Sequence, residues 1–216
     1  MQQRKVKVLN LYAGIGGNRK LWKDANVTAI EKNQEIADVY RSLFPDDTVI
    51  VADAHQFLLD HHLEFDFIWA SPPCQSHSSM RQNLAVRFRG VKPEYPDMKL
   101  YQEIIFLQYN SPEGQKWVVE NVKPYYQTLI KPSVELQRHL LWCNFEIPIK
   151  NFTQSKLRSA QISDLQDYLG MDISQFKIQN KRQILRNCLH PQIGEYIFNL
   201  AQNNVLIKNT EQFKLI

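Results

Sequence analysis

The 216-residue chain has few of the residues on which specialised scaffolds depend. It contains three cysteines, Cys74, Cys143 and Cys188, and no CxxC pair. This argues against a disulfide framework, a zinc knuckle and a thioredoxin-type redox site. Seven glycines and ten prolines are too few for a collagen-like or low-complexity chain. We therefore expect no metal site and a reducing compartment.

Long apolar runs are also missing. No run reaches the ~18 residues that a membrane span requires, and Gly14 interrupts the first segment before a signal-peptide apolar region forms. We expect a soluble, cytoplasmic protein without a membrane partner. The net charge of +4 permits a polyanionic partner without indicating one. A hydrophobic content of 44% and an aromatic content of 11% predict one globular domain with a substantial core.

Short apolar runs alternate with helix-length amphipathic stretches over the first two thirds of the chain. This alternation predicts an α/β fold with a doubly wound, mostly parallel sheet. The predicted strands are Val6–Tyr12, Val27–Ile30, Thr48–Ala52, Phe65–Ala70, Trp117–Val119 and Leu140–Phe145. The predicted helices are Gln34–Phe44, Leu100–Tyr109 and a last helix after Pro191 that packs back on the sheet. Two weakly patterned segments, Ser76–Pro96 and Pro148–Ser163, are predicted to be loops.

A glycine-rich turn follows the first predicted strand and precedes a helical pattern. Gly14, Gly16 and Gly17 lie there, and such a turn lets a ligand approach the backbone. Position 19 is Arg19, so the third glycine of a dinucleotide fingerprint is absent and NAD is disfavoured.

Two acids follow the next two predicted strands. Glu31 ends the second strand, where a carboxylate can accept from ribose hydroxyls, and Asp53 closes the third, where it can meet an adenine amine. With the glycine turn, they favour a nucleoside-bearing cofactor. The alternative is that either acid is an ordinary helix N-cap or loop acid.

A cysteine and a second acid end two further strands. Cys74 follows Pro72 and Pro73 at the carboxyl end of a predicted buried strand, where doubly wound sheets bind ligands. Glu120 is predicted at the tip of the next strand, on the same rim. A lone cysteine is more often a small buried hydrophobe. A thiol and a carboxylic acid facing one nucleoside site instead suggest covalent attack on a base, with the acid protonating a ring nitrogen.

Seven short motifs occur in order between about Val6 and Leu200: LYAGIGG, AIEKN, DAHQF, SPPCQS, VVENVKPY, QRHLLW and RNCLHPQIG. Together they resemble the cytosine-C5 DNA methyltransferase family. The resemblance implies a class I methyltransferase fold, S-adenosylmethionine as cofactor, and a cytosine flipped out of double-stranded DNA as substrate.

The resemblance also implies a role for each motif residue. Cys74 would attack C6 of cytosine, Glu120 would hold N3 and the exocyclic amine, and Arg138 would brace O2. Within the cofactor site, Tyr12 would lie under the adenine, Glu31 would bind the ribose, Asp53 would bind the adenine amine, and Asn187 would close the site from the C-terminal helix. The remaining cofactor-binding residues would be Gly14, Ile15, Gly16, Gly17, Lys32, Ala54 and Pro73. The DNA-binding residues would be Gln75, Ser76, Arg81, Arg87 and Arg89.

The chain departs from the family pattern at three motif positions. Gln137-Arg138-His139 stands where two arginines usually lie one residue apart, so either Arg138 or His139 braces O2. Lys32 stands where an aromatic residue often stacks on adenine, and Arg186 replaces the glycine before Asn187.

A larger departure is the missing target-recognition domain. Residues 1–147 are predicted as the catalytic and cofactor-binding core, 148–163 as a minimal recognition loop, and 164–216 as a segment packing back on the core. The side chains available for reading bases in this loop are Asn151, Gln154, Lys156, Arg158 and Gln161, unless it is a solvated connector.

Two other functions stay open. One is an RNA (tRNA) cytosine-C5 methyltransferase, although the Cys-Phe-Thr signature of that branch is absent. The other is a silent DNA-binding subunit, or half of a split enzyme in which a partner or a homodimer supplies recognition. Retention of Cys74, Glu120 and the glycine turn argues against silence. The target sequence and the biological setting, such as restriction-modification or phage self-protection, are not indicated.

Overall fold

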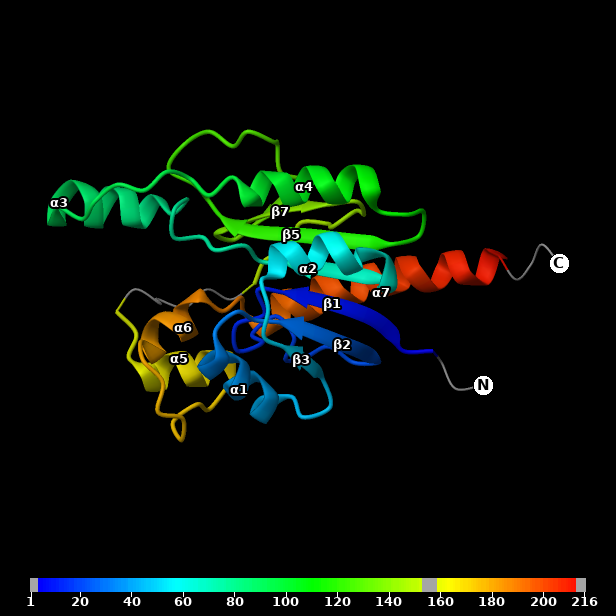
Figure 1. Ribbon diagram of the computed structural model, residues 1–216, viewed down its shortest axis with the longest axis horizontal. Helices are drawn as coiled ribbons and strands as arrows, with labels where there is room; N and C mark the ends of the chain where they lie inside the picture. Colours follow the sequence, from blue (N-terminus) through cyan, green and yellow to red (C-terminus); the bar gives the residue numbers. More distant parts are fainter. Residues whose placement is uncertain (1–3, 153–158, 213–216) are drawn as a thin grey trace.

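Parallel strands form most of one mixed sheet in the computed structural model, which describes residues 4–152 and 159–212. The strand order is β3-β2-β1-β4-β5-β7-β6 (Figure 1). The strands are β1 Val6–Leu11, β2 Ala25–Ile30, β3 Thr48–Ile50, β4 Phe67–Ala70, β5 Lys116–Val122, β6 Val134–Leu136 and β7 His139–Cys143. Strands β1 to β5 pair in parallel, whereas β7 runs antiparallel to both of its neighbours. The predicted mostly parallel α/β sheet is confirmed, and β6 is an unpredicted addition.

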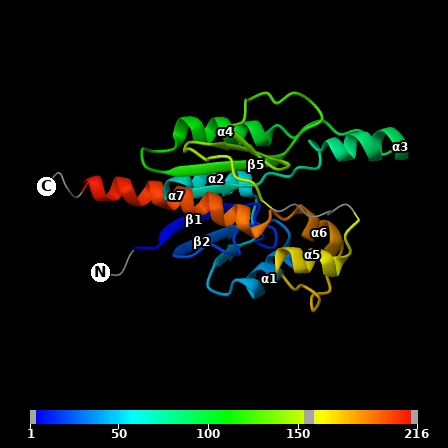
Figure 2. The ribbon, with the colours of Figure 1, turned by 180° about the vertical axis from the view of Figure 1, so that it is seen from behind.

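Helices cover both faces of the sheet because successive buried residues of a strand point to opposite sides. In β4, Phe67 and Trp69 pack in the core that includes α7, while Ile68 and Ala70 pack in the core that includes α2 and α4. Figure 2 shows α7 crossing one face in front of the sheet, with α2 partly behind it. The sheet is therefore doubly wound, as predicted. These helices are α2 Ala54–His61, α4 Lys99–Asn110 and α7 Pro191–Gln212.

The best-predicted helices have local start and stop signals. Helix α1, Gln34–Leu43, begins after Asn33, whose side chain accepts from the Ile36 N–H at 3.1 Å, and it ends just before Pro45. Helix α7 begins at Pro191, where a missing N–H costs nothing. Two shorter helices, α5 Ile162–Leu169 and α6 Lys181–Asn187, complete the C-terminal segment.

Two local predictions are wrong. No helix follows the glycine turn directly, because residues 14–21 form successive turns and loop. Within the predicted loop Ser76–Pro96, residues 79–89 are helical, as the π-helix η2 Arg81–Val86 followed by α3 Arg87–Arg89. This stretch contains neither glycine nor proline until Gly90, which ends it at φ 63°.

The second predicted loop, Pro148–Ser163, is also shorter than expected, since α5 already begins at Ile162. Of its candidate base-reading side chains, Gln154, Lys156 and Arg158 lie outside the described residues. In the described part of the chain, no helix combines the length and apolar character needed to cross a membrane.

The carboxyl ends of the parallel strands all meet at one edge of the sheet. Figures 1 and 2 both show α5 and α6 at this end of the molecule, and α3 standing away from the rest of the fold. This edge is where a doubly wound sheet binds its ligands.

Candidate active site

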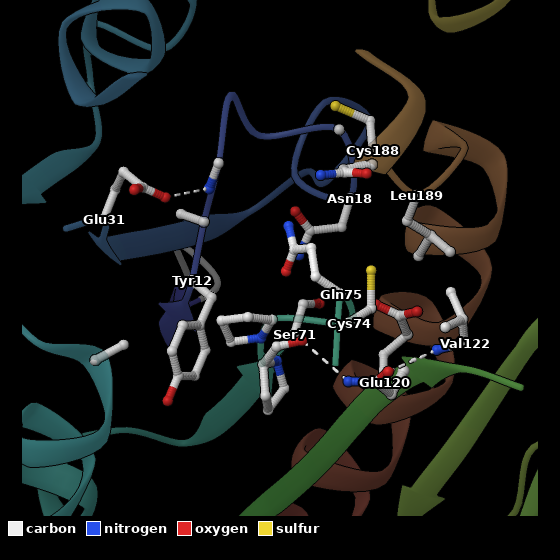
Figure 3. A pocket seen from close by; sticks show the side chains of 18 of the residues that line it. Tyr12, Asn18, Glu31, Ser71, Cys74, Gln75, Glu120, Val122, Cys188 and Leu189 are labelled. Atoms are coloured by element: carbon white, nitrogen blue, oxygen red, sulfur yellow. Dashed lines mark hydrogen bonds between the residues drawn. The ribbon is translucent and has the colours of Figure 1, made fainter. Parts of the chain in front are cut away.

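A cavity of about 440 Å³ opens at the carboxyl ends of β1, β2, β4 and β5 (Figure 3). It brings together most of the predicted catalytic and cofactor residues. Those that line it are Tyr12, Gly14, Ile15, Gly17, Glu31, Lys32, Asp53, Ala54, Pro73, Cys74, Gln75, Glu120, Arg138 and Asn187. Gly16, Ser76, Arg81, Arg87 and Arg89 are not part of the lining.

The glycine turn is tied to the end of β2 by Glu31. One carboxylate oxygen of Glu31 accepts from the Gly14 N–H at 3.0 Å, and the other accepts from the Asn33 N–H at 2.8 Å. Glu31 is therefore not an N-cap, since Asn33 caps α1. Each carboxylate oxygen has a second lone pair, so the group can still accept from a ligand in the cavity.

The other two glycines are needed for packing. A Cβ at Gly17 would lie 2.7 Å from the Cβ of Cys188, and one at Gly16 would lie 2.3 Å from the Phe44 ring. Gly16 therefore lets α1 approach the turn, while Gly17 lets the segment after α6 approach it.

Asp53 is an N-cap that also lines the cavity. Strand β3 ends at Ile50, so Asp53 lies beyond the strand and caps α2 by accepting from the Gln56 N–H at 3.1 Å. Its second oxygen lies 3.5 Å from the Lys32 Nζ and 3.8 Å from the Lys99 Nζ. The Gln56 hydrogen bond, followed by the two lysines, lowers the pKa of Asp53. The cap thus places an ionised carboxylate at the cavity wall.

Tyr12 is held by a buried cluster that the sequence did not reveal. The Tyr12 hydroxyl donates to Oε1 of Glu103 on α4, and His55 Nδ1 lies 3.0 Å from the same oxygen. Glu103 is fully buried, and this burial raises its pKa. Its position in the chain, 91 residues after Tyr12, gives no local signal. One signal was available, because Glu103 interrupts the buried face formed by Leu100, Ile104 and Leu107.

Cys74 begins a turn directly after β4. Its carbonyl accepts from the His77 N–H at 3.1 Å and the Ser78 N–H at 2.9 Å, while its side chain points into the cavity (Figure 3). Burial, with a smaller contribution from the charge of Glu120, raises the pKa of the thiol to about 11, and Arg138 opposes this shift. The thiol is therefore protonated at neutral pH in the free protein.

Glu120 lies inside β5, not at its tip as predicted, because the strand continues to Val122. In the sheet it pairs with Leu141 of β7, and its buried carboxylate lies 2.5 Å from Nδ1 of His139. Burial alone would raise the pKa of Glu120, but His139, a hydrogen bond with Ser71, and Arg138 bring it below its usual value. Glu120 is therefore an ionised acceptor at neutral pH.

The end of β5 and the Cys74 loop are joined directly. The Asn121 side-chain amide donates to the Pro72 carbonyl at 3.0 Å. Asn121 is 1% exposed, so this bond lies in a dry environment. It fixes the spacing between the strand that carries Glu120 and the loop that carries Cys74.

Arg138 links the catalytic edge to the C-terminal segment. Its Nε donates to His139 Nε2 at 3.2 Å, and its Nη2 donates to the Arg186 carbonyl at 2.9 Å. Asn187, which follows, ends α6 and lines the cavity. The prediction that Asn187 acts from the C-terminal helix is therefore wrong, because α7 begins only at Pro191.

The helical arm, defined here as residues 76–97, begins at the edge of the site. The Ser76 hydroxyl accepts from the Asp97 N–H at 3.0 Å, closing the base of the arm. Arg81 pairs with Glu94 at 2.6 Å, so this guanidinium stabilises the arm itself. Within the described ranges, Arg87 and Arg89 form no ion pair.

A second cluster without a sequence signal anchors the base of the arm. His77 is 1% exposed, and its Nδ1 lies 2.5 Å from the Tyr126 hydroxyl. Its carbonyl accepts from the Tyr125 N–H at 3.1 Å, and Ser78 bridges to Pro124. Burial lowers the pKa of His77, which favours the neutral ring. The loop after β5 therefore holds the start of the arm.

The described residues contain no group of three His, Cys, Asp or Glu side chains arranged to bind a metal ion.

A second cysteine at the site, Cys188, also lines the cavity, where burial raises the pKa of its thiol to about 12.

The sheet order, with one antiparallel strand near its end and a cavity at its carboxyl edge, defines a class I methyltransferase fold. Residues 6–124, more than half of the chain, match the C-5 cytosine-specific DNA methylase family. The chain belongs to this family. A comparison with curated proteins finds no match.

Several solved structures resemble parts of the chain. A substituted DNMT2 of Spodoptera frugiperda is 25% identical, with a TM-score of 0.38, and the match covers 55% of this chain and 36% of that one. A putative DNA modification methyltransferase encoded in an Escherichia coli prophage is 21% identical, with a TM-score of 0.36 and coverages of 56% and 33%. The Entamoeba histolytica methyltransferase EhMeth is 16% identical, with a TM-score of 0.43 and coverages of 76% and 60%. The chain thus spans about a third of the first two proteins.

The family implies S-adenosylmethionine as cofactor, and the residues present fit it. Gly14 has φ 55° and no side chain to block the cavity, and a Cβ there would meet nothing within 4 Å. Acceptors for hydroxyl and amine groups, Glu31 and Asp53, line the same cavity as Tyr12. Such a cavity suits a nucleoside with a short charged tail.

Proposed function

We propose that this chain is a DNA (cytosine-5) methyltransferase that uses S-adenosylmethionine and acts on a cytosine flipped out of double-stranded DNA. The observation that carries the proposal is that Cys74 and Glu120 line the same cavity as the glycine turn and Glu31. A nucleophile and an acid-base group therefore face a site built for a nucleoside cofactor.

Each proposed cofactor-binding residue would contact a different part of S-adenosylmethionine. Glu31 would bind the ribose hydroxyls, Asp53 would bind the adenine amine, and the Tyr12 ring would provide an apolar surface. Gly14 would leave room for the methionine part, and Asn187 would close it from the end of α6. When bound, S-adenosylmethionine supplies an electrophilic methyl group.

The covalent step starts from a protonated thiol and an ionised carboxylate. Glu120 would accept the Cys74 proton and pass it to N3 of cytosine, while the thiolate forms a bond to C6. The transfer leaves Glu120 ionised again and gives a neutral adduct whose C5 is nucleophilic. Once C5 carries the methyl group, a solvent base would take the C5 proton and the sulfur–C6 bond would break. The N3 proton would return through Glu120 to the departing thiolate, which restores the thiol and releases the product.

The position of the cavity explains why the base must leave the helix. C5 and C6 of a stacked cytosine are not accessible to a thiol held at the edge of a sheet. Gln75 and Ser76 follow Cys74 at the start of the helical arm, and we propose that they contact the DNA around the flipped base. Arg87 and Arg89 would contact phosphates.

Recognition is proposed to be short. The core of residues 1–147 and the segment 164–216 leave only residues 148–163 between them, with Asn151 and Gln161 as described candidates for base contacts. Each bidentate base contact contributes about 1–3 kcal/mol of discrimination, so we expect a target of about two to three base pairs. A second copy or a partner subunit would lengthen that site.

Tritiated methyl transfer to duplex DNA and to tRNA, measured in parallel with purified protein, tests the proposal. We expect label in random-sequence duplex DNA, and sequencing of the methylated positions should show a short context. Label confined to tRNA would replace the proposal with RNA methylation. Labelling of neither, with S-adenosylmethionine binding intact, would point to a subunit that needs a partner.

A further inference from the structure

The contacts of His139 lie outside the roles assigned above. This residue directly follows Arg138 in the segment where the family usually has two arginines. His139 begins β7 and pairs with Val122 of β5. Glu120 lies two residues before Val122 on the same strand. His139 is 5% exposed, so both ring nitrogens depend on protein partners.

The two hydrogen bonds of His139 determine its tautomer. Arg138 Nε can only donate, so His139 Nε2, at 3.2 Å, must be the acceptor. The ring proton is then on Nδ1, which donates to Glu120 at 2.5 Å. The order of donation is therefore Arg138 to His139 to Glu120.

This order leaves His139 without a donor for substrate. A neutral imidazole has one N–H, and here it is used on Glu120. Arg138 donates through Nε and Nη2, and its Nη1 has no hydrogen-bond partner among the described residues while the residue lines the cavity. Of the two candidates for bracing the cytosine O2, Arg138 is therefore the one with a free donor.

We infer that His139 is a positioning residue, which orients the Glu120 carboxylate through a hydrogen bond whose direction Arg138 fixes. The inference rests on the proposed function, because it concerns the proton that Glu120 passes between Cys74 and cytosine. An imidazole suits this role because its neutral ring offers a single donor and no fixed charge.

The surroundings of Glu120 support a specific effect on pH dependence. The groups that influence it are His139 on β7, Arg138 before β7, and Ser71 and Cys74 after β4. Without the His139 donor, burial would be opposed only by Ser71 and Arg138, and the pKa of Glu120 would rise. Glu120 would then start to become protonated closer to neutral pH and could no longer accept the thiol proton.

Two substitutions of similar size test the roles of the two His139 ring nitrogens separately. In His139→Asn the amide nitrogen can occupy the position of Nδ1, which keeps a donor to Glu120. In His139→Gln the amide reaches the position of Nε2 and leaves Glu120 without that donor. We expect His139→Gln to lower kcat by about 100-fold and His139→Asn by about tenfold or less. Binding of S-adenosylmethionine should stay within about twofold in both, since His139 contacts no proposed cofactor residue.

The pH dependence gives a readout that a packing role would not change. The acidic limb of kcat/KM should move upward by about one pH unit or more in His139→Gln and stay near that of the unsubstituted protein in His139→Asn. Equal rates and equal acidic limbs in the two variants would overturn the inference, as would unfolding of both, which would indicate a purely structural role.

A measurement without substrate separates this inference from the proposed function. The carboxyl carbon of Glu120, labelled with carbon-13 and assigned with Glu120→Gln, can be titrated by NMR. We expect a higher midpoint in His139→Gln than in His139→Asn or the unsubstituted protein. An identical midpoint in all three would overturn the inference even if methyl transfer is normal. A raised midpoint in a protein that methylates nothing would instead count against the proposed function alone.

Discussion

The sheet edge and the helical arm differ in how their polar groups are held. At the sheet edge, Glu31, Glu120 and Asn121 each bond to a neighbouring strand or loop within the fold. In the arm, Arg81 and Glu94 pair with each other, and Phe88 is 79% exposed. The geometry of the chemical groups is therefore set before any substrate arrives. Exposed side chains of the arm, such as Phe88, are not fixed by the rest of the fold in this way.

The largest expected effect is on the nucleophile. Cys74→Ser should abolish methyl transfer, because a serine hydroxyl is far less acidic than a thiol and a far weaker nucleophile. Binding of S-adenosylmethionine, measured by isothermal titration, should be unchanged. Duplex DNA containing 5-fluorocytosine should form a denaturation-resistant adduct with the unsubstituted protein. The same adduct in Cys74→Ser would assign the attack to Cys143 or Cys188.

The thiol pKa provides a pH prediction at the same place. Since the pKa of Cys74 is raised to about 11, its alkylation by iodoacetamide should rise about tenfold per pH unit between pH 7 and 10. In Glu120→Gln the midpoint should fall, because removing the carboxylate removes the repulsion of the thiolate. Peptide mapping by mass spectrometry follows Cys74 separately from the other two cysteines. A rate that is constant from pH 7 to 10 would contradict the protonated resting state.

Substituting a proposed cofactor-binding residue should change the affinity for S-adenosylmethionine. Glu31→Ala should weaken S-adenosylmethionine binding by about 1.5–3 kcal/mol, because a charged acceptor is removed and the Gly14 N–H loses its partner. Isothermal titration measures this change. The matched control is Glu35→Ala, on the exposed first turn of α1, which should leave affinity unaltered. Equal affinities in Glu31→Ala and the unsubstituted protein would remove Glu31 from the ribose site.

Substitutions in the core should lower the free energy of unfolding more than substitutions in the arm. In Gly194→Ala the new Cβ would lie 2.2 Å from the Asn18 carbonyl oxygen, so helix or turn must shift, at a cost of about 1–3 kcal/mol or more. Gly90→Ala, at the end of the helix within the arm, meets no atom within 4 Å and should cost about 1 kcal/mol for its φ of 63°. Urea denaturation measures both. A larger destabilisation in Gly90→Ala would mean that the arm is more tightly packed than its surroundings indicate.

The smallest expected effect tests the arm as a DNA-binding surface. Neutralising Arg87 and Arg89 should reduce the salt slope of DNA binding by about 0.9 for each phosphate that the arm no longer neutralises. Arg81→Gln should act differently, because its charge is already paired with Glu94, and it should alter arm stability more than the slope. Fluorescence anisotropy across a salt series distinguishes them. An unchanged slope in the Arg87 and Arg89 variant would indicate a solvated basic surface.

The same contrast explains which parts of the site are predictable. The positions of Cys74, Glu31 and Glu120 follow from strand order and local motifs, since parallel strands bring their carboxyl ends to one edge. The contacts of Tyr12 with Glu103, and of His77 with Tyr126, join residues 91 and 49 positions apart. No short-range pattern encodes such pairs. The helix in the arm could not be predicted because its apolar residues Leu84 and Phe88 face solvent, so periodicity did not reveal a buried side.

The contact between Gly194 and the glycine turn has a consequence for how the protein is made. The Trp22 ring N–H donates to the Gly194 carbonyl at 3.0 Å, and a side chain at position 194 would collide with Asn18. A segment synthesised early is thus completed by one synthesised late. During translation, the nascent chain would carry strands β1 to β5 for many seconds before α7 leaves the ribosome. The packing around Asn18 and Trp22 is therefore completed only after α7 has been synthesised.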